Sequence, residues 1–206
     1  MKIIFWSAFF CLLSFSGFAQ SKPPKTASDF NLLGYKCIRA GDYKSSVPFF
    51  NRAVEMDSNN QEYIHNRGYA LSMLNDYQGA LTDYVKLTQL APGVSEYYYF
   101  VANMLQNLGK FKECIVQYSK AIELAPNIHY YYFNRGNAYL KLKNYVLAIK
   151  DYNQTLELNP EHFGTYSNRG LAKFNLNDRK GACLDWNLAF KNGHQAANNF
   201  LINYCK

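Results

Sequence analysis

The sequence predicts an all-α fold: a right-handed solenoid of five helix pairs, closed by a capping helix at the C-terminus. Small and aromatic residues recur every 34 residues along most of the chain. Within each period, the apolar positions have the spacing of helix faces. Proline recurs at the same place in three periods, and the residue before a proline avoids the helical region. A period of this length is typical of stacked helix pairs.

Three columns of residues define the period. The first holds small residues at Gly34, Gly68, Ala102, Gly136 and Gly170. The second, twelve residues later, also holds small residues, at Ser46, Ala80, Cys114, Ala148 and Ala182. The third, four residues further on, is aromatic: Phe50, Tyr84, Tyr118, Tyr152 and Trp186. We expect two helix backbones to approach closely at the small residues, with the aromatic ring filling the space beside them. No repeat buries its own apolar face, so neighbouring repeats stack.

The period divides most of the chain into five repeats: 27–60, 61–94, 95–128, 129–162 and 163–196. Their helices are expected at 28–39, 43–56, 61–74, 77–90, 95–108, 111–124, 129–142, 145–158, 163–176 and 179–191. A last helix between Gln195 and Tyr204 caps the stack, and residues 197–206 form the capping segment. Pro48 lies inside the second helix of repeat one. Because proline removes a helical hydrogen bond, we expect that helix to start late, with Ser46 as its N-cap, or to be kinked.

The repeat pattern resembles that of the tetratricopeptide repeat (TPR) family, which is aromatic-x-x-Leu-Gly-x-x-Tyr, then Ala-x-x-x-Phe, then Pro. The fourth repeat carries it as Tyr132, Arg135, Gly136, Tyr139, Ala148, Tyr152 and Pro160. The resemblance covers residues 27–196. It implies a non-catalytic module for protein–protein interaction. It also implies that the first helices of the repeats line a concave groove, which holds an extended peptide or a helix of the partner.

The first 19 residues have the pattern of a signal peptide. Lys2 precedes an apolar run from Ile3 to Phe15, and Gly17-Phe18-Ala19 supplies small residues for cleavage before Gln20. The run is shorter than the roughly 20 residues that a spanning helix needs. We therefore expect an exported, bacterial-type protein, periplasmic or secreted, with a linker at residues 20–26 and no integral membrane segment after cleavage. An uncleaved N-terminal anchor is the alternative.

Charge and motifs exclude several classes of function. The chain has a net charge of +7, and the leader removes only Lys2, but no run of consecutive basic residues marks a nucleic-acid surface. The four histidines are scattered, without the spacing of metal ligands. Sequence motifs of hydrolases, nucleotide-binding loops and dinucleotide-binding folds do not occur. We expect no catalytic residue, no metal and no cofactor, and a protein or peptide as the partner.

Arginine and aspartate vary together between repeats. Repeats two, four and five carry an arginine before the glycine column and an aspartate sixteen residues later: Arg67 with Asp83, Arg135 with Asp151, and Arg169 with Asp185. Repeats one and three carry neither, having Leu33 with Phe49 and Val101 with Gln117. We expect an ion pair between the two helices of each of the three repeats, because a guanidinium suits a carboxylate. The alternative is that the arginines line a ligand groove.

The cysteines that remain after the leader have two expected roles. Cys37 and Cys114 stand in columns of core residues, so we expect them to pack in the interior. Cys183 stands in a column that faces the following repeat, which here is the capping segment with Cys205. A disulfide between Cys183 and Cys205 would hold the cap in place. Two buried free thiols are the alternative, because a disulfide requires a Cα separation that the sequence does not show.

The outer side of the first helices carries amides and aromatic rings. The candidate groove residues are Asn66, Tyr69, Tyr99, Asn103, Tyr130, Asn134, Asn137, Lys141 and Asn168. Asparagine both donates and accepts hydrogen bonds and so can bind a peptide backbone, while tyrosine adds rigid contact area. The alternative is a solvated face whose asparagines hold neighbouring loops.

Two further expectations concern the partner. The carboxylate clamp of some TPR proteins is matched by Asn103 and Asn134, but Tyr99, Gly164 and Asn168 stand where that clamp needs basic residues. Aromatic residues outside the repeat framework gather at 97–100 and 130–133, which makes the middle of the chain the first place to look for a partner. The alternative function is a structural part of a cell-envelope or secretion assembly, using the convex face and the cap.

Overall fold

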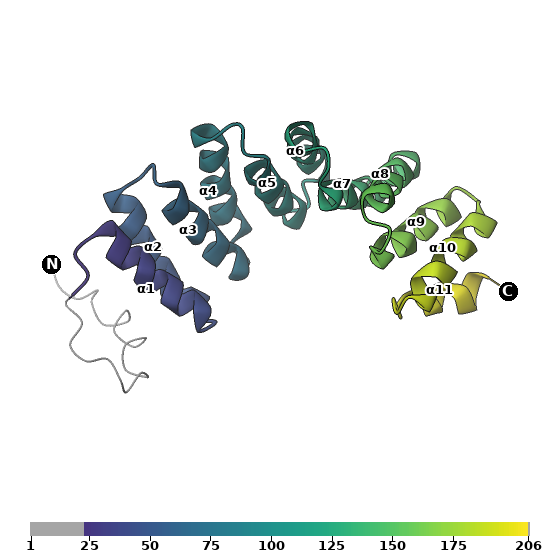
Figure 1. Ribbon diagram of the computed structural model, residues 1–206, viewed down its shortest axis with the longest axis horizontal. Coiled ribbons are helices and arrows are strands. Elements are labelled where there is room, and N and C mark those ends of the chain that lie inside the picture. The colour runs from purple at the N-terminus through teal and green to yellow at the C-terminus, as the bar shows by residue number, and fades with distance from the viewer. Residues whose placement is uncertain (1–22, 206) are drawn as a thin grey trace. The chain divides into compact units, whose positions relative to one another are not determined.

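The structure is a computed structural model that describes residues 23–205. Within that range it is all-α, as predicted, with eleven helices and no strand (Figure 1). In chain order they are α1 (Ala27–Arg39), α2 (Tyr43–Met56), α3 (Gln61–Met73), α4 (Tyr77–Leu90), α5 (Ser95–Asn107), α6 (Phe111–Leu124), α7 (His129–Lys141), α8 (Tyr145–Leu158), α9 (Phe163–Asn175), α10 (Arg179–Lys191) and α11 (Ala197–Tyr204). The predicted signal peptide, residues 1–19, lies outside the described residues.

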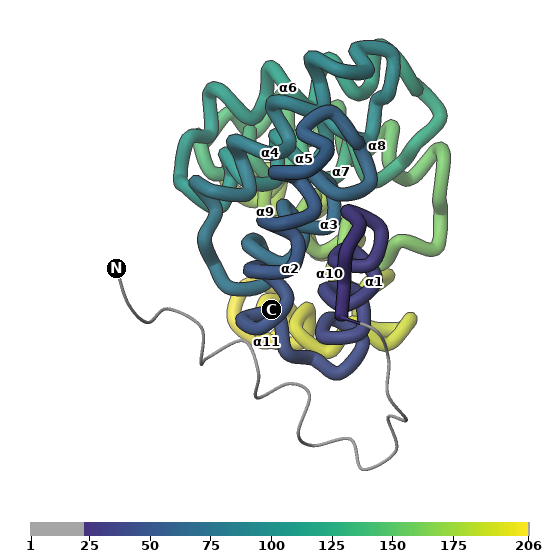
Figure 2. Tube along the Cα trace, turned by 90° about the vertical axis from the view of Figure 1, so that its left-hand side faces the viewer, coloured from purple at the N-terminus to yellow at the C-terminus, as the bar shows by residue number. Residues whose placement is uncertain are grey.

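The helices divide between two compact units, Met1–Pro92 and Gly93–Lys206. The described part of unit 1 holds two helix pairs, α1 with α2 and α3 with α4. Unit 2 holds three pairs, α5 with α6, α7 with α8 and α9 with α10, followed by α11 on α10. Within a unit, the second helix of each pair also packs on the first helix of the next. Figure 2 shows the same helix pairs from a second direction.

Short side chains start most of the second helices. Asp42, Asp76, Asn144 and Asp178 each accept a hydrogen bond from the backbone N–H three residues on. Such N-caps satisfy a donor that the helix itself leaves unpaired. Lys110 stands at the same position before α6 and makes no side-chain cap. Its backbone angles, φ −83° and ψ 62°, are nevertheless close to those of Asp178, φ −82° and ψ 71°.

The expected late start of the second helix in repeat one was wrong. That helix, α2, begins at Tyr43 with Asp42 as its N-cap, and Pro48 lies inside it. Ser46 does not cap the helix, because its hydroxyl donates to the Tyr43 carbonyl at 2.7 Å. Proline at this position removes the donor for the carbonyl four residues back, and its ring crowds that carbonyl. The Asp42 cap pairs a donor of the first turn, and the helix continues through Pro48 to Met56.

The core follows the columns of the repeat. The aromatic column is fully buried or nearly so, from Phe50 to Trp186. Four of the rings lie against the glycine of their own first helix. A Cβ added to Gly136 would lie 2.8 Å from Cε1 of Tyr152, and one added to Gly170 would lie 2.6 Å from Nε1 of Trp186. Glycine is therefore required by close approach at these two positions. In residues 23–205, no helix combines the length and the apolar character needed to cross a bilayer.

Candidate functional site

Two asparagines on the first helices of unit 2 are oriented by buried tyrosines. The hydroxyl of Tyr118 donates to Oδ1 of Asn103 at 2.7 Å, and that of Tyr152 donates to Oδ1 of Asn137 at 2.9 Å. Both rings are fully buried, and burial is the main cause that raises the pKa of each phenol. Each hydroxyl therefore stays protonated and fixes the carbonyl end of the amide inward. Within residues 23–205 no hydrogen bond engages Nδ2 of Asn103 or Asn137.

Other predicted groove asparagines bind their own chain. In unit 1, Nδ2 of Asn66 donates to Oδ1 of Asn31 at 3.0 Å, linking α3 to α1. In unit 2, Nδ2 of Asn168 donates to Oδ1 of Asn137 at 2.9 Å, linking α9 to α7. Nδ2 of Asn134 donates to the Tyr130 carbonyl at 2.8 Å and lies 3.4 Å from the hydroxyl of Tyr99. These three side chains hold neighbouring first helices together. The alternative prediction, in which the asparagines hold neighbouring parts of the chain, is therefore correct for them, although they join helices where loops were expected.

The predicted tyrosines of unit 2 form one cluster at the start of α5 and α7. Tyr99 lies 5.0 Å from Tyr130 and 5.2 Å from Tyr131, measured between ring centroids. Tyr131 is only 2% exposed, and its hydroxyl lies 3.1 Å from the Ser95 hydroxyl. Tyr99 and Tyr130 keep part of their surface accessible. The cluster thus supplies a rigid aromatic wall beside Asn103, with Asn134 at its edge.

Two of the predicted groove residues lie apart from these clusters. Tyr69 of unit 1 is exposed and packs edge-on against Tyr43, with ring centroids 6.1 Å apart. Lys141 is exposed in the last turn of α7, where a cation complements the helix dipole.

Three histidines come together near the start of α9. The rings of His129 and His162 lie 5.5 Å apart between centroids, and a Cβ added to Gly164 would meet both His162 and His194 within 4 Å. Burial, reinforced by the charge of His129, lowers the pKa of His162. Sequence spacing did not reveal this cluster, because its members belong to two repeats. Among residues 23–205 no set of His, Cys, Asp or Glu side chains has the geometry of a metal site.

The arginines are occupied by structure-building contacts. Nη2 of each lies 2.6–2.7 Å from the aspartate of its own repeat: Arg67 with Asp83, Arg135 with Asp151, and Arg169 with Asp185. The Nε atom of each arginine also donates to the second carboxylate oxygen, so each pair is bidentate. Hydrogen bonding and attraction to Asp151 outweigh burial and raise the pKa of Arg135. The arginines therefore join the two helices of their repeats, as the first of the two interpretations predicted.

Each arginine also forms a hydrogen bond with the preceding helix, a contact that was not predicted from the sequence. Nη1 donates to a polar side chain sixteen residues earlier in the chain: Arg67 to Asn51 at 3.2 Å, Arg135 to Ser119 at 2.9 Å and Arg169 to Asn153 at 2.7 Å. We call this set an arginine clamp: one arginine, the aspartate of the following helix and the polar residue of the preceding helix. The signal was present in the sequence as a polar column at these three positions.

The C-terminal cap is held covalently. Cys183 of α10 and Cys205 after α11 form a disulfide with a Cα separation of 5.7 Å. The ring of Phe200 stacks on Trp186, with centroids 4.9 Å apart, so α11 covers the end of the last repeat's core. Cys37 and Cys114 are buried, and burial is the main cause that raises the pKa of Cys114 to about 11. Of the two alternatives for Cys183 and Cys205, the structure contains the disulfide.

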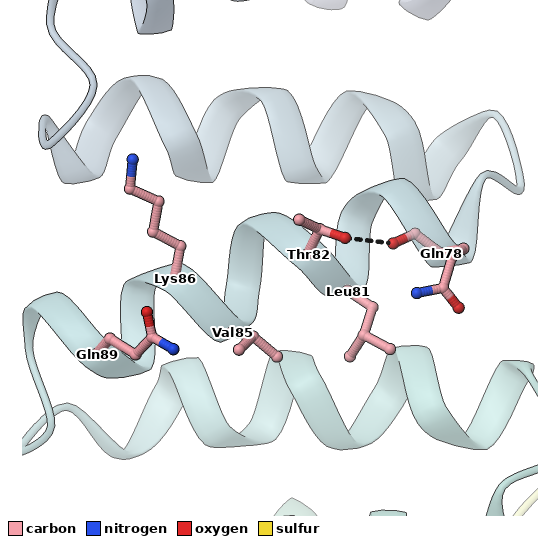
Figure 3. A pocket seen from close by; sticks show the side chains of 6 residues that line it. All are labelled: Gln78, Leu81, Thr82, Val85, Lys86 and Gln89. Atoms are coloured by element: carbon pink, nitrogen blue, oxygen red, sulfur yellow. Dashed lines mark hydrogen bonds between the residues drawn. The ribbon is translucent and has the colours of Figure 1, made fainter.

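A shallow pocket in unit 1 lies along one helix. Its lining residues all come from α4: Gln78, Leu81, Thr82, Val85, Lys86 and Gln89. Leu81 and Val85 point to one side of the helix and Lys86 to the other (Figure 3). No second helix contributes a lining residue, and the polar side chains of the lining do not converge on one point. We therefore place the candidate site at the first-helix face of unit 2, defined as the accessible side of α5, α7 and α9 around Asn103 and Asn137.

Three family models match the chain. Two described as tetratricopeptide repeat match residues 129–162 and 30–60, and one described as TPR repeat matches residues 102–143. No curated protein sequence matches the chain significantly. These matches identify tetratricopeptide repeats in the chain, and the eleven helices of its described part form an all-α solenoid fold of that kind.

Solved structures agree with this fold. The structure of MamA from Desulfovibrio magneticus RS-1 is 20% identical, with 84% of this chain and 97% of that chain covered and a TM-score of 0.78. YrrB, described as a TPR protein with an unusual peptide-binding site, is 18% identical over 84% and 90%, with a TM-score of 0.72. TTC0263, a thermophilic TPR protein from Thermus thermophilus, is 16% identical over 87% and 97%, with a TM-score of 0.61. The fold and the repeats define a protein–protein interaction module.

Proposed function

We propose that unit 2 binds an extended peptide segment of a partner protein on its first-helix face. The observation that carries the proposal is the orientation of Asn103 and Asn137. Their amide oxygens are held by the buried hydroxyls of Tyr118 and Tyr152. The amino groups, one repeat apart, are left to donate to backbone carbonyls of a bound chain. The mechanism is recognition by hydrogen bonds, without covalent chemistry.

Two features support a peptide as the ligand. Tyr99 and Tyr130 form a rigid wall beside the amides, and tyrosine supplies contact area at low entropic cost. YrrB, which has a similar fold, is described as having a peptide-binding site. Asn134 and Asn168 belong to the proposed binding face as positioning residues, because Asn134 contacts Tyr130 and Tyr99 and Asn168 contacts Asn137. Lys141 flanks the face in the last turn of α7. Asn66 and Tyr69 belong to unit 1 and lie outside the face as defined above.

The test is a peptide selection followed by titration. Random 12-residue peptides displayed on phage are selected on the chain from residue 20 onward, and enriched peptides are titrated by calorimetry. We expect Asn103→Ala with Asn137→Ala to weaken binding by about 10-fold to 100-fold, because two hydrogen bonds are lost. Asn187→Ala, an exposed amide on α10, serves as the matched control. Equal binding by the double variant and the control would contradict the proposal.

A second candidate is a structural part of a cell-envelope or secretion assembly. It rests on apolar side chains exposed on α10, Leu184 at 60% and Leu188 at 45%. Lys150 and Gln154 stand at the equivalent positions of the preceding repeat, so the apolar pair is particular to the last one. Light scattering of the chain over a concentration series separates the two functions. A molecular mass that rises with concentration, and stays constant in Leu184→Lys with Leu188→Gln, would favour assembly.

We further propose that the protein is exported, into the periplasm or the medium. The leader pattern at residues 1–19 supports this, and so does the Cys183–Cys205 disulfide, because disulfides persist in oxidising compartments. N-terminal sequencing of the protein recovered from cell fractions tests both points. A chain that begins at Gln20 outside the cytoplasm is expected, and an intact leader on a cytoplasmic chain would contradict the proposal.

A further inference from the structure

Arginine clamps tie every pair of neighbouring repeats within a unit. In unit 1, Arg67 of α3 binds Asn51 of α2 and Asp83 of α4. In unit 2, Arg135 of α7 joins α6 to α8, and Arg169 of α9 joins α8 to α10. The aspartates are almost completely buried. Each clamp therefore couples the folding of one repeat to that of the repeat before it.

The three clamp positions are all changed where unit 1 meets unit 2 in the sequence. Moving each position by the 34-residue period gives Val85 for the polar residue, Val101 for the arginine and Gln117 for the aspartate. Valine neither donates nor accepts a hydrogen bond, and none of the three side chains carries a charge. No clamp can form from these residues. The change falls at the boundary between the two compact units, Pro92 and Gly93.

The connection at this boundary also contains a glycine without a local reason. Gly93 has no positive φ, and a Cβ added to it would meet nothing within 4 Å. Neither the backbone conformation nor the available space therefore requires glycine. Asn59, Asn127 and Glu161 stand at the equivalent place in the other connections. Because glycine loses more conformational freedom on folding than other residues, this connection is more costly to order than the others.

We propose that the chain unfolds as two cooperative units that divide at Gly93, and that the absent clamp sets this division. In a repeat protein, stability is the sum of repeat terms and nearest-neighbour terms, so the weakest neighbour term separates the cooperative units. Unit 2 has three helix pairs, two clamps and a disulfide-held cap, whereas unit 1 has two pairs and one clamp. Unit 1 therefore opens first, while the first-helix face of unit 2 stays folded.

Hydrogen exchange of the full chain, followed by mass spectrometry, tests this division. The slowest amides of α1 to α4 are expected to share one protection factor, and those of α5 to α10 a second that is about 10-fold or more higher. Fraying from the end of a uniformly coupled chain would instead raise protection gradually from α1 to α6. A gradual rise, or equal protection across Gly93, would overturn the proposal.

Two sets of replacements assign the cause. Ser119→Val, Arg135→Val and Asp151→Gln place the residues of the boundary at the junction of repeats three and four. They are expected to create a second step in protection between α6 and α7. Val85→Asn, Val101→Arg and Gln117→Asp place the three residue types of a clamp at the boundary and are expected to reduce the step at Gly93 to less than about threefold.

The two sets are read together with the unmodified chain. Val101 is only 3% exposed, so the restoring set can fail to fold; the removing set and the unmodified chain then decide. Unchanged protection across α5 to α10 after removal of the clamp would contradict its role, even if the step at Gly93 is present. A step in protection at Gly93 that remains after the three replacements at the boundary would also contradict the role of the clamp.

Discussion

At the scale of residues, the clamps place carboxylates where water is largely excluded. The side chains of Asp83, Asp151 and Asp185 are 3–4% exposed, against 17–23% for their arginines. Exposed ion pairs contribute little to stability. Breaking a buried pair costs more, because the remaining charge stays buried without its partner. The clamps therefore belong with the buried pairs, although the partial exposure of each arginine reduces the cost.

Replacement of Asp151 by Asn is expected to lower the free energy of unfolding by about 3 kcal/mol. The change keeps the shape of the side chain but leaves the Arg135 guanidinium without a counter-charge. Urea unfolding followed by circular dichroism measures the loss. Glu157→Gln, an exposed acid on the same helix, is the control and should change stability by less than about 0.5 kcal/mol. Similar losses for the two variants would contradict the burial argument.

Two glycines allow a matched comparison. Gly136→Ala would push a methyl group to 2.8 Å from Tyr152, and we expect the overpacking to cost about 1–3 kcal/mol. Gly93→Ala adds the same methyl group in open space, where we expect a gain of about 0.4–1 kcal/mol from the less flexible unfolded chain. Thermal unfolding of both variants, read separately for the two units, checks the signs. A loss at Gly93 would show that the site does require glycine.

At the scale of elements, the second helices differ in how they start. Four of them begin with an aspartate or asparagine cap, and α6 begins at Lys110 with the same backbone geometry and no side-chain cap. Lys110→Asp is expected to stabilise the chain by about 1 kcal/mol, helped by a negative charge at the positive end of the helix dipole. Chemical denaturation measures the gain. The control is Lys112→Asp, two residues further along in the first turn, where the side chain is not at the N-cap. An equal gain in stability from that replacement would show that the change of charge alone is the cause.

The histidines beside α9 make stability depend on pH. Burial and His129 lower the pKa of His162 below its ordinary value of 6.5. As the pH falls below about 6.5, His162 takes up a proton in the unfolded chain but not in the folded chain. The contribution of His162 to the free energy of unfolding is therefore complete above that pH and is lost as the pH falls below it. Urea midpoints at pH 7.5 and 5.5 should therefore differ. His162→Gln should reduce the difference, and an unchanged difference in that variant would contradict the role of His162.

At the scale of the whole molecule, the 34-residue period made the helix pairs and their bounds predictable from the sequence. Helix bounds followed from columns such as Gly136 and Tyr152, because close helix contacts within a pair are local in sequence. The predicted late start of α2 at Ser46 was wrong, because the N-cap is Asp42 and the helix contains Pro48. The polar partners in the preceding helix were missed although they stand regularly sixteen residues before each arginine. Which asparagines present their amino groups was not predictable, because this depends on hydroxyl groups from the second helices.

Unit 2 is proposed to bind an extended peptide through Asn103 and Asn137. The most direct measurement is a nitrogen–proton correlation spectrum of the labelled chain, recorded during titration with a peptide selected as described above. We expect the side-chain amide signals of Asn103 and Asn137 to move, together with backbone signals of α5 and α7. Signals of α6, α8 and α10 that face away from these helices should stay in place. Shifts confined to α10 and α11, with both side-chain amides unmoved, would contradict peptide binding through Asn103 and Asn137.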